Sequence, residues 1–390
     1  MFKIKTFNSI SVTGLEKFGR DKYEVSSDSA TPDAILLRSH KLQVDEIGES
    51  VKAIARAGAG TNNVPIEACS ERGVVVFNTP GANANAVKEL VLAGMLLGSR
   101  GILSGMNYVN GQTELKDAAA MSKLMEAEKK HFKGNEIKGK TLGVVGLGAI
   151  GSMVARTALD LGMNVVGYDP ALSVDAAWRL PSSVVKIENL QSLLAKSDFV
   201  TLHLPVLDST RHLINKDSIA SFKPGGKLLN FAREEIVDTE AVVWALQEGV
   251  ISNYIADFPH PDLIGIKGVM LMPHIGASTD EAEDNCAVMA VEQLQDFLER
   301  GNIVNSVNFP MTVLERSGDT RLCIANKNIP KMLGQILSEL ADQNINVIDM
   351  INKSRGELAY NLIDIDGDVP QEIVDHLCSI EGVIGVRVIR

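Results

Sequence analysis

The feature that most constrains this fold is a single run, residues 141–151, which reads TLGVVGLGAIG. Its first half is almost wholly apolar, the pattern of a strand buried on both faces. Its glycines mark a turn that opens a helical pattern, IGSMVARTALDLG, and a second apolar strand, NVVGYD, follows. Strand, turn, helix and strand in this order predict a parallel sheet with a crossover helix.

The same alternation extends through about 300 residues. Before the glycine run, the predicted strands are FKIKTF, AILLRS, VKAIARAG and VVVFNT; after it they are DFVTLHLP, GGKLLNF, NYIADF and VMLMPH. Helical patterns lie between them, so the fold class is α/β with parallel, helix-covered sheets. A chain of 390 residues is long enough for two or three such domains.

Two segments depart from this alternation. Residues 110–135 are polar and helical, which fits either an exposed connector or an arm that contacts another subunit. The last 70 residues change character and read as strand, helix, hairpin, helix and strand, a ferredoxin-like β-α-β-β-α-β unit.

Charge and cysteine content narrow the functional class. With 38 basic and 49 acidic residues the net charge is −11, and no basic stripe interrupts it, which argues against nucleic acid or an anionic membrane as a partner. No apolar run approaches 18 residues. The four cysteines are scattered, without metal-ligand spacing, as reduced cytosolic thiols are. We therefore expect a cytoplasmic protein that uses no metal.

The glycine run has the spacing of a dinucleotide-binding loop. Gly146 permits the tight turn, Gly148 lets the backbone approach a pyrophosphate, and Gly151 allows close packing of helix on strand. Asp169 ends the next strand, where it can accept hydrogen bonds from ribose hydroxyls and repel a 2′-phosphate. This favours NAD over NADP. The alternative is a glycine turn with a capping aspartate.

Four further motifs carry a resemblance. LGVVGLGAIG, LHLPVLDSTRHLI, NFAREEIVD and MPHIGAST match, in order and spacing, those of the D-isomer-specific 2-hydroxyacid dehydrogenases. The family fold implies a flavodoxin-like substrate domain (residues 1–95 plus 285–305), an inserted Rossmann domain (96–284) and an active site in the cleft between them. The ferredoxin-like unit resembles an ACT domain (318–390), joined by a linker (306–317).

The resemblance assigns three catalytic residues. Arg233 would bind the substrate carboxylate bidentately, and His274 would exchange the hydroxyl proton. Most relatives carry a glutamate that assists this histidine; counting without a gap places Asp262 there. Each assignment has an alternative. Arg233 could form an ion pair with Glu234 or Glu235, His274 could be a core histidine, and Asp262 could be a loop aspartate beside a proline.

The resemblance also implies two sets of binding residues. The cofactor set is Gly146, Gly148, Ala149, Ile150, Gly151, Asp169, Thr79, His203, Leu204, Pro205, Phe231, Ala232, Asp257, Gly276 and Ala277. The substrate set is Arg56, Gly58, Ala59 and Gly60, with Arg38; both arginines could equally be surface or ion-pair residues.

With the C-terminal unit, the resemblance implies NAD-dependent oxidation of 3-phospho-D-glycerate to 3-phosphohydroxypyruvate, the first step of L-serine biosynthesis. The alternatives are another small D-2-hydroxy acid, such as glycerate, or a non-catalytic dinucleotide-sensing regulator.

In the C-terminal unit, Asn326, Asn328 and Asn346 match or stand at positions that bind serine in relatives. Lys331, however, replaces a glycine of the motif, so the unit is either regulatory or a structural dimerisation module. We expect a homodimer or homotetramer.

Overall fold

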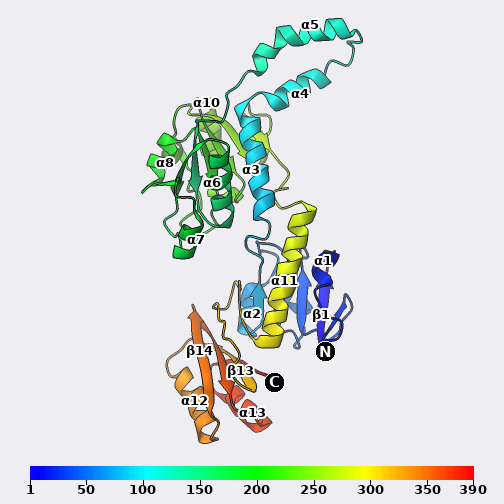
Figure 1. Ribbon diagram of the computed structural model, residues 1–390, viewed down its shortest axis with the longest axis vertical. Helices are drawn as coiled ribbons and strands as arrows, with labels where there is room; N and C mark the ends of the chain where they lie inside the picture. Colours follow the sequence, from blue (N-terminus) through cyan, green and yellow to red (C-terminus); the bar gives the residue numbers. More distant parts are fainter. The chain divides into compact units, whose positions relative to one another are not determined.

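The computed structural model describes residues 1–390, except for the side chain of Asp175 (Figure 1). The chain forms two compact units. Unit 1 combines Met1–Asn83 with Thr279–Arg390, and unit 2 is Ala84–Ser278. The expected boundaries at residues 95 and 285 fall inside helices α3 (Ala84–Ser99) and α11 (Asp280–Arg300), each of which lies in one unit.

Unit 2 is built on a seven-stranded parallel sheet. Its strand order is β12-β11-β10-β9-β6-β7-β8, the doubly wound order in which two halves diverge from the central strand β6. The strands are β6 (Thr141–Val145), β7 (Asn164–Tyr168), β8 (Val185–Lys186), β9 (Phe199–Leu202), β10 (Gly226–Asn230), β11 (Ile251–Ala256) and β12 (Val269–Leu271). The central strands are buried almost throughout, as their apolar runs predict.

Helices cover both faces of this sheet. One face packs against α3 and α6 (Ala149–Asp160), and the other against α8 (Leu190–Lys196), α9 (Lys216–Ile219) and α10 (Thr239–Gln247). The remaining helical segments of the sheet region are α7 (Val174–Arg179) and the short turns η3 (Glu234–Ile236) and η4 (Pro261–Leu263). All strands end at one edge of the sheet, because all neighbouring pairs are parallel.

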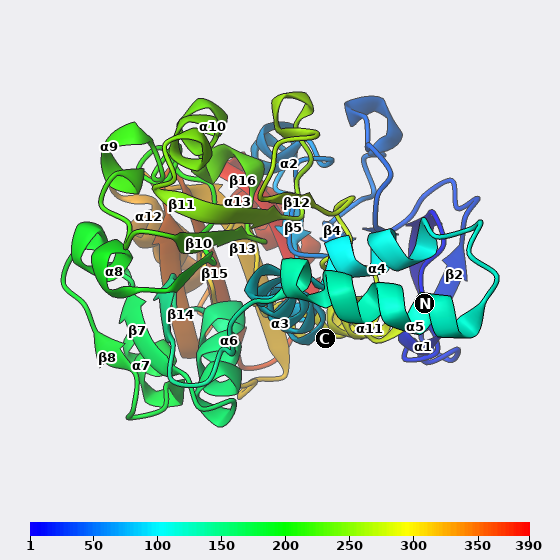
Figure 2. The same ribbon diagram turned by 90° about the horizontal axis from the view of Figure 1, so that it is seen from above.

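An arm extends from the end of α3. It consists of α4 (Ile102–Asn110), α5 (Ala118–Glu128) and η2 (Lys129–Phe132), with α4 and α5 side by side (Figures 1 and 2). The Phe132 ring lies 5.5 Å from that of Tyr108, which joins the two helical stretches. The polar segment predicted as a connector or contact arm is therefore this helical arm.

Unit 1 contains a five-stranded parallel sheet of order β2-β1-β3-β4-β5, the flavodoxin-like order. The strands are β1 (Phe2–Phe7), β2 (Tyr23–Ser26), β3 (Ala34–Leu37), β4 (Ala53–Arg56) and β5 (Val75–Phe77). Helices α1 (Val12–Leu15) and α11 pack on one face, while α2 (Ile66–Glu71) and the turn η1 (Val44–Glu46) lie toward the other.

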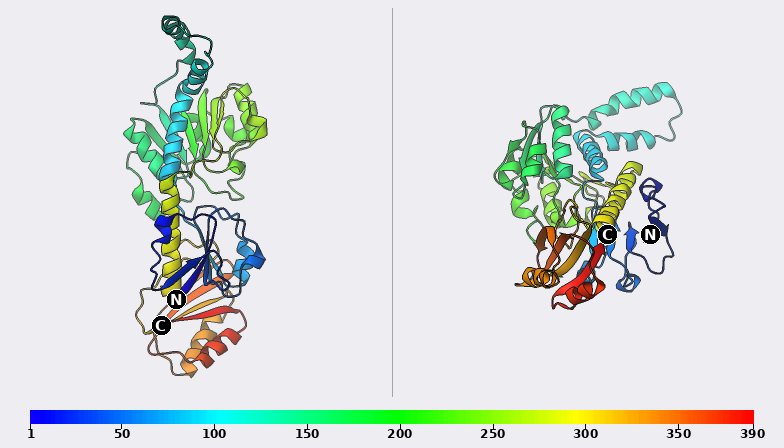
Figure 3. Two further views of the ribbon diagram at one scale, coloured as in Figure 1. Left: turned by 90° about the vertical axis from the view of Figure 1, so that its right-hand side faces the viewer. Right: turned by 60° about the horizontal axis from the view of Figure 1, so that its bottom comes forward.

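The C-terminal part of unit 1 is an antiparallel sheet of order β14-β15-β13-β16. Its elements are β13 (Thr320–Lys327), α12 (Met332–Asp342), β14 (Val347–Arg355), β15 (Leu358–Ile365), α13 (Gln371–Ser379) and β16 (Val383–Ile389). Figure 3 shows α12 and α13 on one face of this sheet. This is the predicted β-α-β-β-α-β unit.

The other face of the antiparallel sheet packs within unit 1 against the end of α11. Arg321 and Asp364 form a fully buried bidentate ion pair, with N···O distances of 2.6 and 2.8 Å. Arg321 also donates to the Arg300 and Leu314 carbonyl oxygens, so each nitrogen of the buried guanidinium has an acceptor. The Tyr360 hydroxyl donates to the Gly301 carbonyl oxygen at 2.9 Å. These contacts fix the antiparallel sheet to the helix end.

The segment predicted as a linker also packs within unit 1. Val307 donates its N–H to the Val76 carbonyl oxygen of β5, and the Asn308 side chain accepts the Val76 N–H and donates to the Val74 carbonyl oxygen just before the strand. Phe309 is fully buried. This segment therefore lies along the sheet edge.

The predicted fold class is confirmed: two parallel sheets and one antiparallel ferredoxin-like sheet. The short strands β2 and β8 were missed, because neither has a continuous apolar run. Among the helices that the structure describes, none combines the length and apolarity that a membrane crossing requires.

Candidate active site

The glycine loop lies between β6 and α6, at the edge where the parallel strands of unit 2 end. Gly146 has φ 89°, and a side chain there would collide with the His203 backbone. A Cβ on Gly151 would collide with the Gly146 carbonyl oxygen. Gly148 precedes the first turn of α6, and a Cβ there would meet open space. The three glycines thus permit the turn, the packing and the open approach that a pyrophosphate needs at a helix N-terminus.

Asp169 follows β7 at the same edge. One carboxylate oxygen accepts the Leu147 N–H at 2.8 Å, and the other accepts the Ala171 N–H at 3.0 Å. The aspartate therefore does cap the loop, as the structural alternative supposed. Each carboxylate oxygen can accept more than one hydrogen bond, so this capping leaves room for ribose hydroxyls.

His203 follows β9 and lies against the glycine loop. Its Nε2 is 2.9 Å from the Thr201 hydroxyl, and its Nδ1 is buried without a partner among the described residues. Burial lowers the pKa of His203 to about 3. The ring is therefore neutral near pH 7 and offers an unpaired nitrogen beside the loop.

This depressed pKa predicts an acid-sensitive fold. Between the ordinary pKa and about 3, the unfolded chain binds a proton that folded His203 excludes, so the free energy of unfolding falls as pH falls. The limiting slope for one proton is about 1.4 kcal/mol per pH unit. We expect the free energy of unfolding, measured by urea denaturation, to fall less between pH 7 and 5 in His203→Gln than in the unsubstituted protein. His131→Gln, an exposed position of the arm, is the control. Equal pH dependence in all three proteins would contradict this expectation.

Arg233 lies just past β10, where Asn230 shapes the turn. The fully buried Asn230 amide donates to the Arg233 carbonyl oxygen at 2.8 Å and accepts the Ala232 N–H at 3.2 Å. The Arg233 guanidinium is part-buried and donates to the Ala232 carbonyl oxygen at 2.7 Å. Among the described side chains no ion pair joins it to Glu234 or Glu235. The guanidinium therefore keeps donors available for an anion.

Asn230 was missed by sequence reasoning, although a signal exists. It is the one polar residue in the apolar run LLNFA, and a buried amide needs partners. Here those partners form the backbone turn that carries Arg233.

His274 lies in the loop after β12. It is exposed, has φ 56°, and its ring is 4.9 Å from that of Phe258. The buried Asp257 carboxylate accepts the N–H groups of Ile275 at 2.8 Å and Gly276 at 2.6 Å. A Cβ on Gly276 would crowd this carboxylate. Asp257, predicted only as a cofactor residue, thus holds the backbone turn that presents His274.

The expected pairing of Asp262 with His274 is not formed in this structure. The Asp262 side chain is 72% exposed, lies 3.7 Å from the His260 Nδ1, and lines a surface pocket with residues of α10. No hydrogen bond or ion pair joins the described side chains of Asp262 and His274. The Pro261-Asp262 step begins the η4 turn, as the loop alternative supposed.

The predicted substrate residues gather in unit 1, where β3 and β4 end. The Arg56 Nε donates to the Arg38 carbonyl oxygen at 3.0 Å. The Arg56 guanidinium folds over Gly58, where a Cβ would collide with it. Arg38 forms an ion pair with Glu283 of α11 at 2.7 Å, so its charge is already matched. Arg56 is thus beside the glycine turn, as predicted, and Arg38 matches the ion-pair alternative.

The other predicted cofactor residues belong to the same two strand-end edges. In unit 2, Ala149 and Ile150 open α6, Leu204 and Pro205 follow His203, Phe231 and Ala232 precede Arg233, and Ala277 follows Gly276. In unit 1, the buried Thr79 donates its N–H to the Gly58 carbonyl oxygen, and Ala59 and Gly60 continue that turn.

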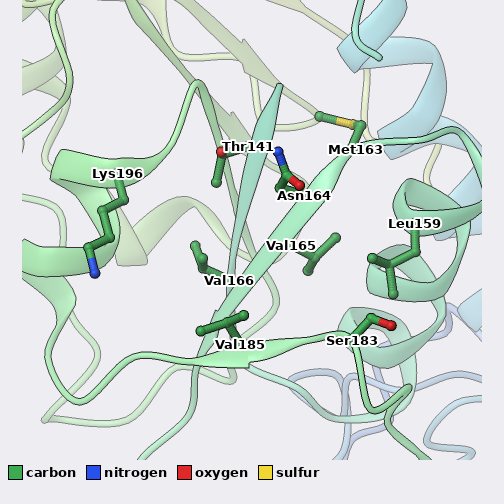
Figure 4. A pocket seen from close by; sticks show the side chains of 9 residues that line it. All are labelled: Thr141, Leu159, Met163, Asn164, Val165, Val166, Ser183, Val185 and Lys196. Atoms are coloured by element: carbon green, nitrogen blue, oxygen red, sulfur yellow. The ribbon is translucent and has the colours of Figure 1, made fainter. Parts of the chain in front are cut away.

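A separate pocket of about 440 Å³ lies beside β7 and is lined by Thr141, Val165, Val185 and Lys196 among others (Figure 4). None of the predicted site residues lines it.

The predicted serine-binding amides do not meet within one chain. Asn326 is buried, and its side-chain oxygen accepts from Asn361. Asn328 follows the end of β13, whereas Asn346 precedes the start of β14. Both strands pair with β15, and the register sets the start of β14 beside the start of β13. Asn328 and Asn346 therefore lie at opposite ends of the sheet.

Comparison with known proteins identifies a family. Residues 105–276 match the model described as D-isomer specific 2-hydroxyacid dehydrogenase, NAD binding domain. The chain is 31% identical over 369 residues to D-3-phosphoglycerate dehydrogenase of Haemophilus influenzae, covering 90% of this chain and 85% of the relative. It is 37% identical over 280 residues to hydroxypyruvate reductase of Thermotoga maritima, covering 67% and 83%.

Some relatives are longer. D-3-phosphoglycerate dehydrogenase of Methanocaldococcus jannaschii is 34% identical over 356 residues, or 89% of this chain, but this chain spans only 64% of that relative.

Solved structures agree with the fold. NAD+-bound 3-phosphoglycerate dehydrogenase of Entamoeba histolytica matches with a TM-score of 0.61 at 28% identity, covering 79% of this chain and 98% of that one. D-mandelate dehydrogenase of Rhodotorula graminis, at 24% identity, matches in fold with a TM-score of 0.66 and covers 81% and 99%. The open glycine loop and Asp169 fit the dinucleotide seen in the first of these. The chain therefore belongs to the D-isomer specific 2-hydroxyacid dehydrogenase family and carries its NAD-binding domain.

Proposed function

We propose that this protein is an NAD-dependent dehydrogenase that oxidises 3-phospho-D-glycerate to 3-phosphohydroxypyruvate, the reaction that opens L-serine biosynthesis. The observation that carries the proposal is the share of this chain that aligns with relatives of this name. Relatives named D-3-phosphoglycerate dehydrogenase align with 89–90% of this chain, a share that cannot be reached without part of the C-terminal antiparallel sheet.

The proposed chemistry assigns one task to each of two side chains. Arg233, held by Asn230, binds the C1 carboxylate through the planar fork of its guanidinium and directs a donor at the C2 oxygen. His274, presented by the turn that Asp257 holds, accepts the C2 hydroxyl proton during oxidation and returns it during reduction. NAD, when bound, supplies the acceptor for the C2 hydride.

The phosphate would be bound in unit 1. Arg56 lies beside the Gly58–Gly60 turn, and both are placed at the strand ends where parallel sheets bind ligands. Arg38 contributes less in this proposal, because Glu283 already neutralises it.

A second candidate is reduction of hydroxypyruvate or a related 2-oxo acid. The similarity to the Thermotoga maritima hydroxypyruvate reductase favours it, at 37% identity, although that match covers only 67% of this chain. The two functions share the carboxylate and acid–base groups and differ in the need for a phosphate.

An absorbance assay at the NADH band separates these candidates. The oxidative arm compares 3-phosphoglycerate, 2-hydroxyglutarate, lactate and glycerate, and the reductive arm compares 3-phosphohydroxypyruvate with hydroxypyruvate. We expect kcat/KM to be highest for the phosphorylated member of each set. Equal or higher values for glycerate and hydroxypyruvate would favour the second candidate, and no turnover of any substrate would favour a non-catalytic regulator.

Cofactor preference gives a separate prediction. Asp169→Ala removes both a ribose acceptor and a negative charge that repels a 2′-phosphate. We therefore expect weaker NAD binding and a lower ratio of kcat/KM with NAD to that with NADP. Because Asp169 also caps Leu147, the melting temperature of Asp169→Asn serves as the control for loop damage. An unchanged cofactor ratio would mean that Asp169 only caps the loop.

Regulation by L-serine and assembly into a homodimer or homotetramer remain part of this proposal. The test is inhibition of the NADH-linked assay by L-serine, with D-serine as control. Asn328→Ala and Asn346→Ala should each weaken inhibition if these amides bind the ligand.

A further inference from the structure

Another pocket lies in unit 2, away from the glycine loop. It has a volume of about 600 Å³ and is lined by residues at the beginnings of β10, β11 and β12 and at the base of the arm. Parallel strands begin at the edge opposite to that where they end. The pocket therefore shares no residue with the candidate cofactor and catalytic groups.

Four cationic side chains line this pocket, and no acidic one does. They are Arg100, Lys133, Lys227 and Lys267. Amide and hydroxyl groups, including Asn135, Asn253 and Ser252, add further polar atoms, and apolar side chains such as Leu97, Leu103 and Met270 line the rest. Such a concentration of positive charge is unusual in a chain whose net charge is −11.

None of these four cations has an acidic partner among the described side chains. Nor does any hydrogen bond among the described residues involve their side-chain nitrogen atoms, although the Lys227 backbone N–H donates to the Asp198 carbonyl oxygen. Lys227 is part-buried, and its ammonium lies 5.1 Å from the Phe199 ring centroid. Burial lowers the pKa of Lys227, with Lys140 adding repulsion and Asp198 opposing the shift. The nearby Asp198 is itself paired with Lys223 at 2.6 Å.

Helix ends offer another explanation for two of these four cations. Arg100 directly follows α3, where the carbonyl end of a helix attracts positive charge. Lys133 likewise caps the end of η2, whereas Lys227 and Lys267 do not follow the end of a helix. An anion in the pocket would be attracted to all four cations, and none of the residues that line the pocket would repel it.

The two ends of the arm also meet at this pocket, where backbone hydrogen bonds connect them. The Gly101 N–H donates to the Phe132 carbonyl oxygen at 3.2 Å, and the Asn135 N–H donates to the Ser99 carbonyl oxygen at 2.9 Å. Arg100 and Lys133 come from the two ends of the arm, whereas Lys227 and Lys267 belong to the sheet region. An anion bound by all four would bridge the arm and the sheet.

We propose that this pocket is a binding site for a small anion with two or more phosphate or carboxylate groups, and that the bound anion holds the base of the arm against the sheet. Several negative charges suit several cations, and the volume admits a molecule larger than a single phosphate. The proposal is independent of which hydroxy acid the enzyme uses.

The test is calorimetric titration of the NAD-saturated protein with inorganic pyrophosphate and, separately, with citrate at constant ionic strength. NAD occupies the glycine loop, so pyrophosphate cannot bind there. The variant is Lys133→Ala with Lys267→Ala, both exposed, and the control is Lys123→Ala with Lys130→Ala, which removes the same charge from the arm outside the pocket. We expect about 10-fold weaker binding in the variant and at most twofold weaker binding in the control.

Binding of pyrophosphate alone would identify a phosphorylated ligand class, and binding of citrate alone a polycarboxylate class. Equal affinities in the variant and the control, or no binding of either anion to the unsubstituted protein, would overturn the site. Hydrogen exchange tests whether the bound anion holds the base of the arm. In that case the amides of Gly101 and Asn135 should exchange more slowly with the anion bound. Unchanged exchange in a protein that binds the anion would overturn the role at the arm.

Discussion

Replacing Arg233 by alanine is expected to lower kcat/KM at least about 100-fold, the scale found when one oriented donor to a reacting oxygen is lost. Both kcat and KM should change, because the proposed carboxylate contact exists in the ground state and in the transition state. Steady-state kinetics with 3-phosphoglycerate measure this directly. The affinity for NADH, followed by fluorescence titration, should change little, since the glycine loop and Asp169 are untouched.

Two further variants sharpen that result. Arg233→Lys keeps the charge but loses the planar fork, so its activity should lie between those of the unsubstituted protein and Arg233→Ala. Arg211→Ala removes an exposed arginine from the same unit and should leave the kinetics unchanged. If Arg233→Ala retains catalysis within a few-fold, Arg233 does not bind the substrate.

The second large effect is expected for His274→Asn. Loss of a general acid–base group lowers rates by roughly 100-fold to 10,000-fold, so kcat should fall within that range in both directions of the reaction. The pH profile of kcat/KM for oxidation should also lose the limb that reports deprotonation of the base. A variant that keeps this limb would assign proton transfer to another group.

Asp262→Asn is the matched companion, because it removes one charge and keeps the shape. The Asp262 carboxylate lies nearest to the His260 ring and is exposed, so we expect kcat to stay within about threefold of the unsubstituted protein, well below the scale of a general acid–base group. A 10-fold loss accompanied by a shift of the pH profile would show that Asp262 reaches His274 once substrate is bound. It would then have the role that the family glutamate suggested.

Much of the candidate site could be predicted because its chemistry is local. The glycine loop depends on φ at Gly146 and on clearance at Gly148 and Gly151, and all three follow from residues adjacent in the chain. The buried strands could also be predicted from local sequence, because a strand covered on both faces is apolar at nearly every position. The order of the strands within each sheet, by contrast, is known from the tertiary structure.

The role of Asp257 in holding the turn before α11 could not be predicted from the sequence. Its carboxylate holds the N–H groups of Ile275 and Gly276, and this contact exists only because β11 and β12 are neighbours that end at the same edge. Asp262 shows the converse. Counting along the chain placed it at a family position, but its side chain lies 3.7 Å from the His260 Nδ1, in the turn that begins at Pro261.

Only the tertiary structure decided which charges are paired. Arg38 and Glu283 are far apart in the chain, yet their ion pair distinguishes Arg38 from Arg233, for which no acidic partner is described. The pairing of Arg321 with Asp364 likewise fixes the antiparallel sheet to the end of α11. By itself, the sequence determined most elements of this protein, their order along the chain and the glycine loop, because these depend on near neighbours and on the burial of each strand. Partners across the fold were decided by packing, since the side chains that meet there come from elements whose contact no local pattern encodes.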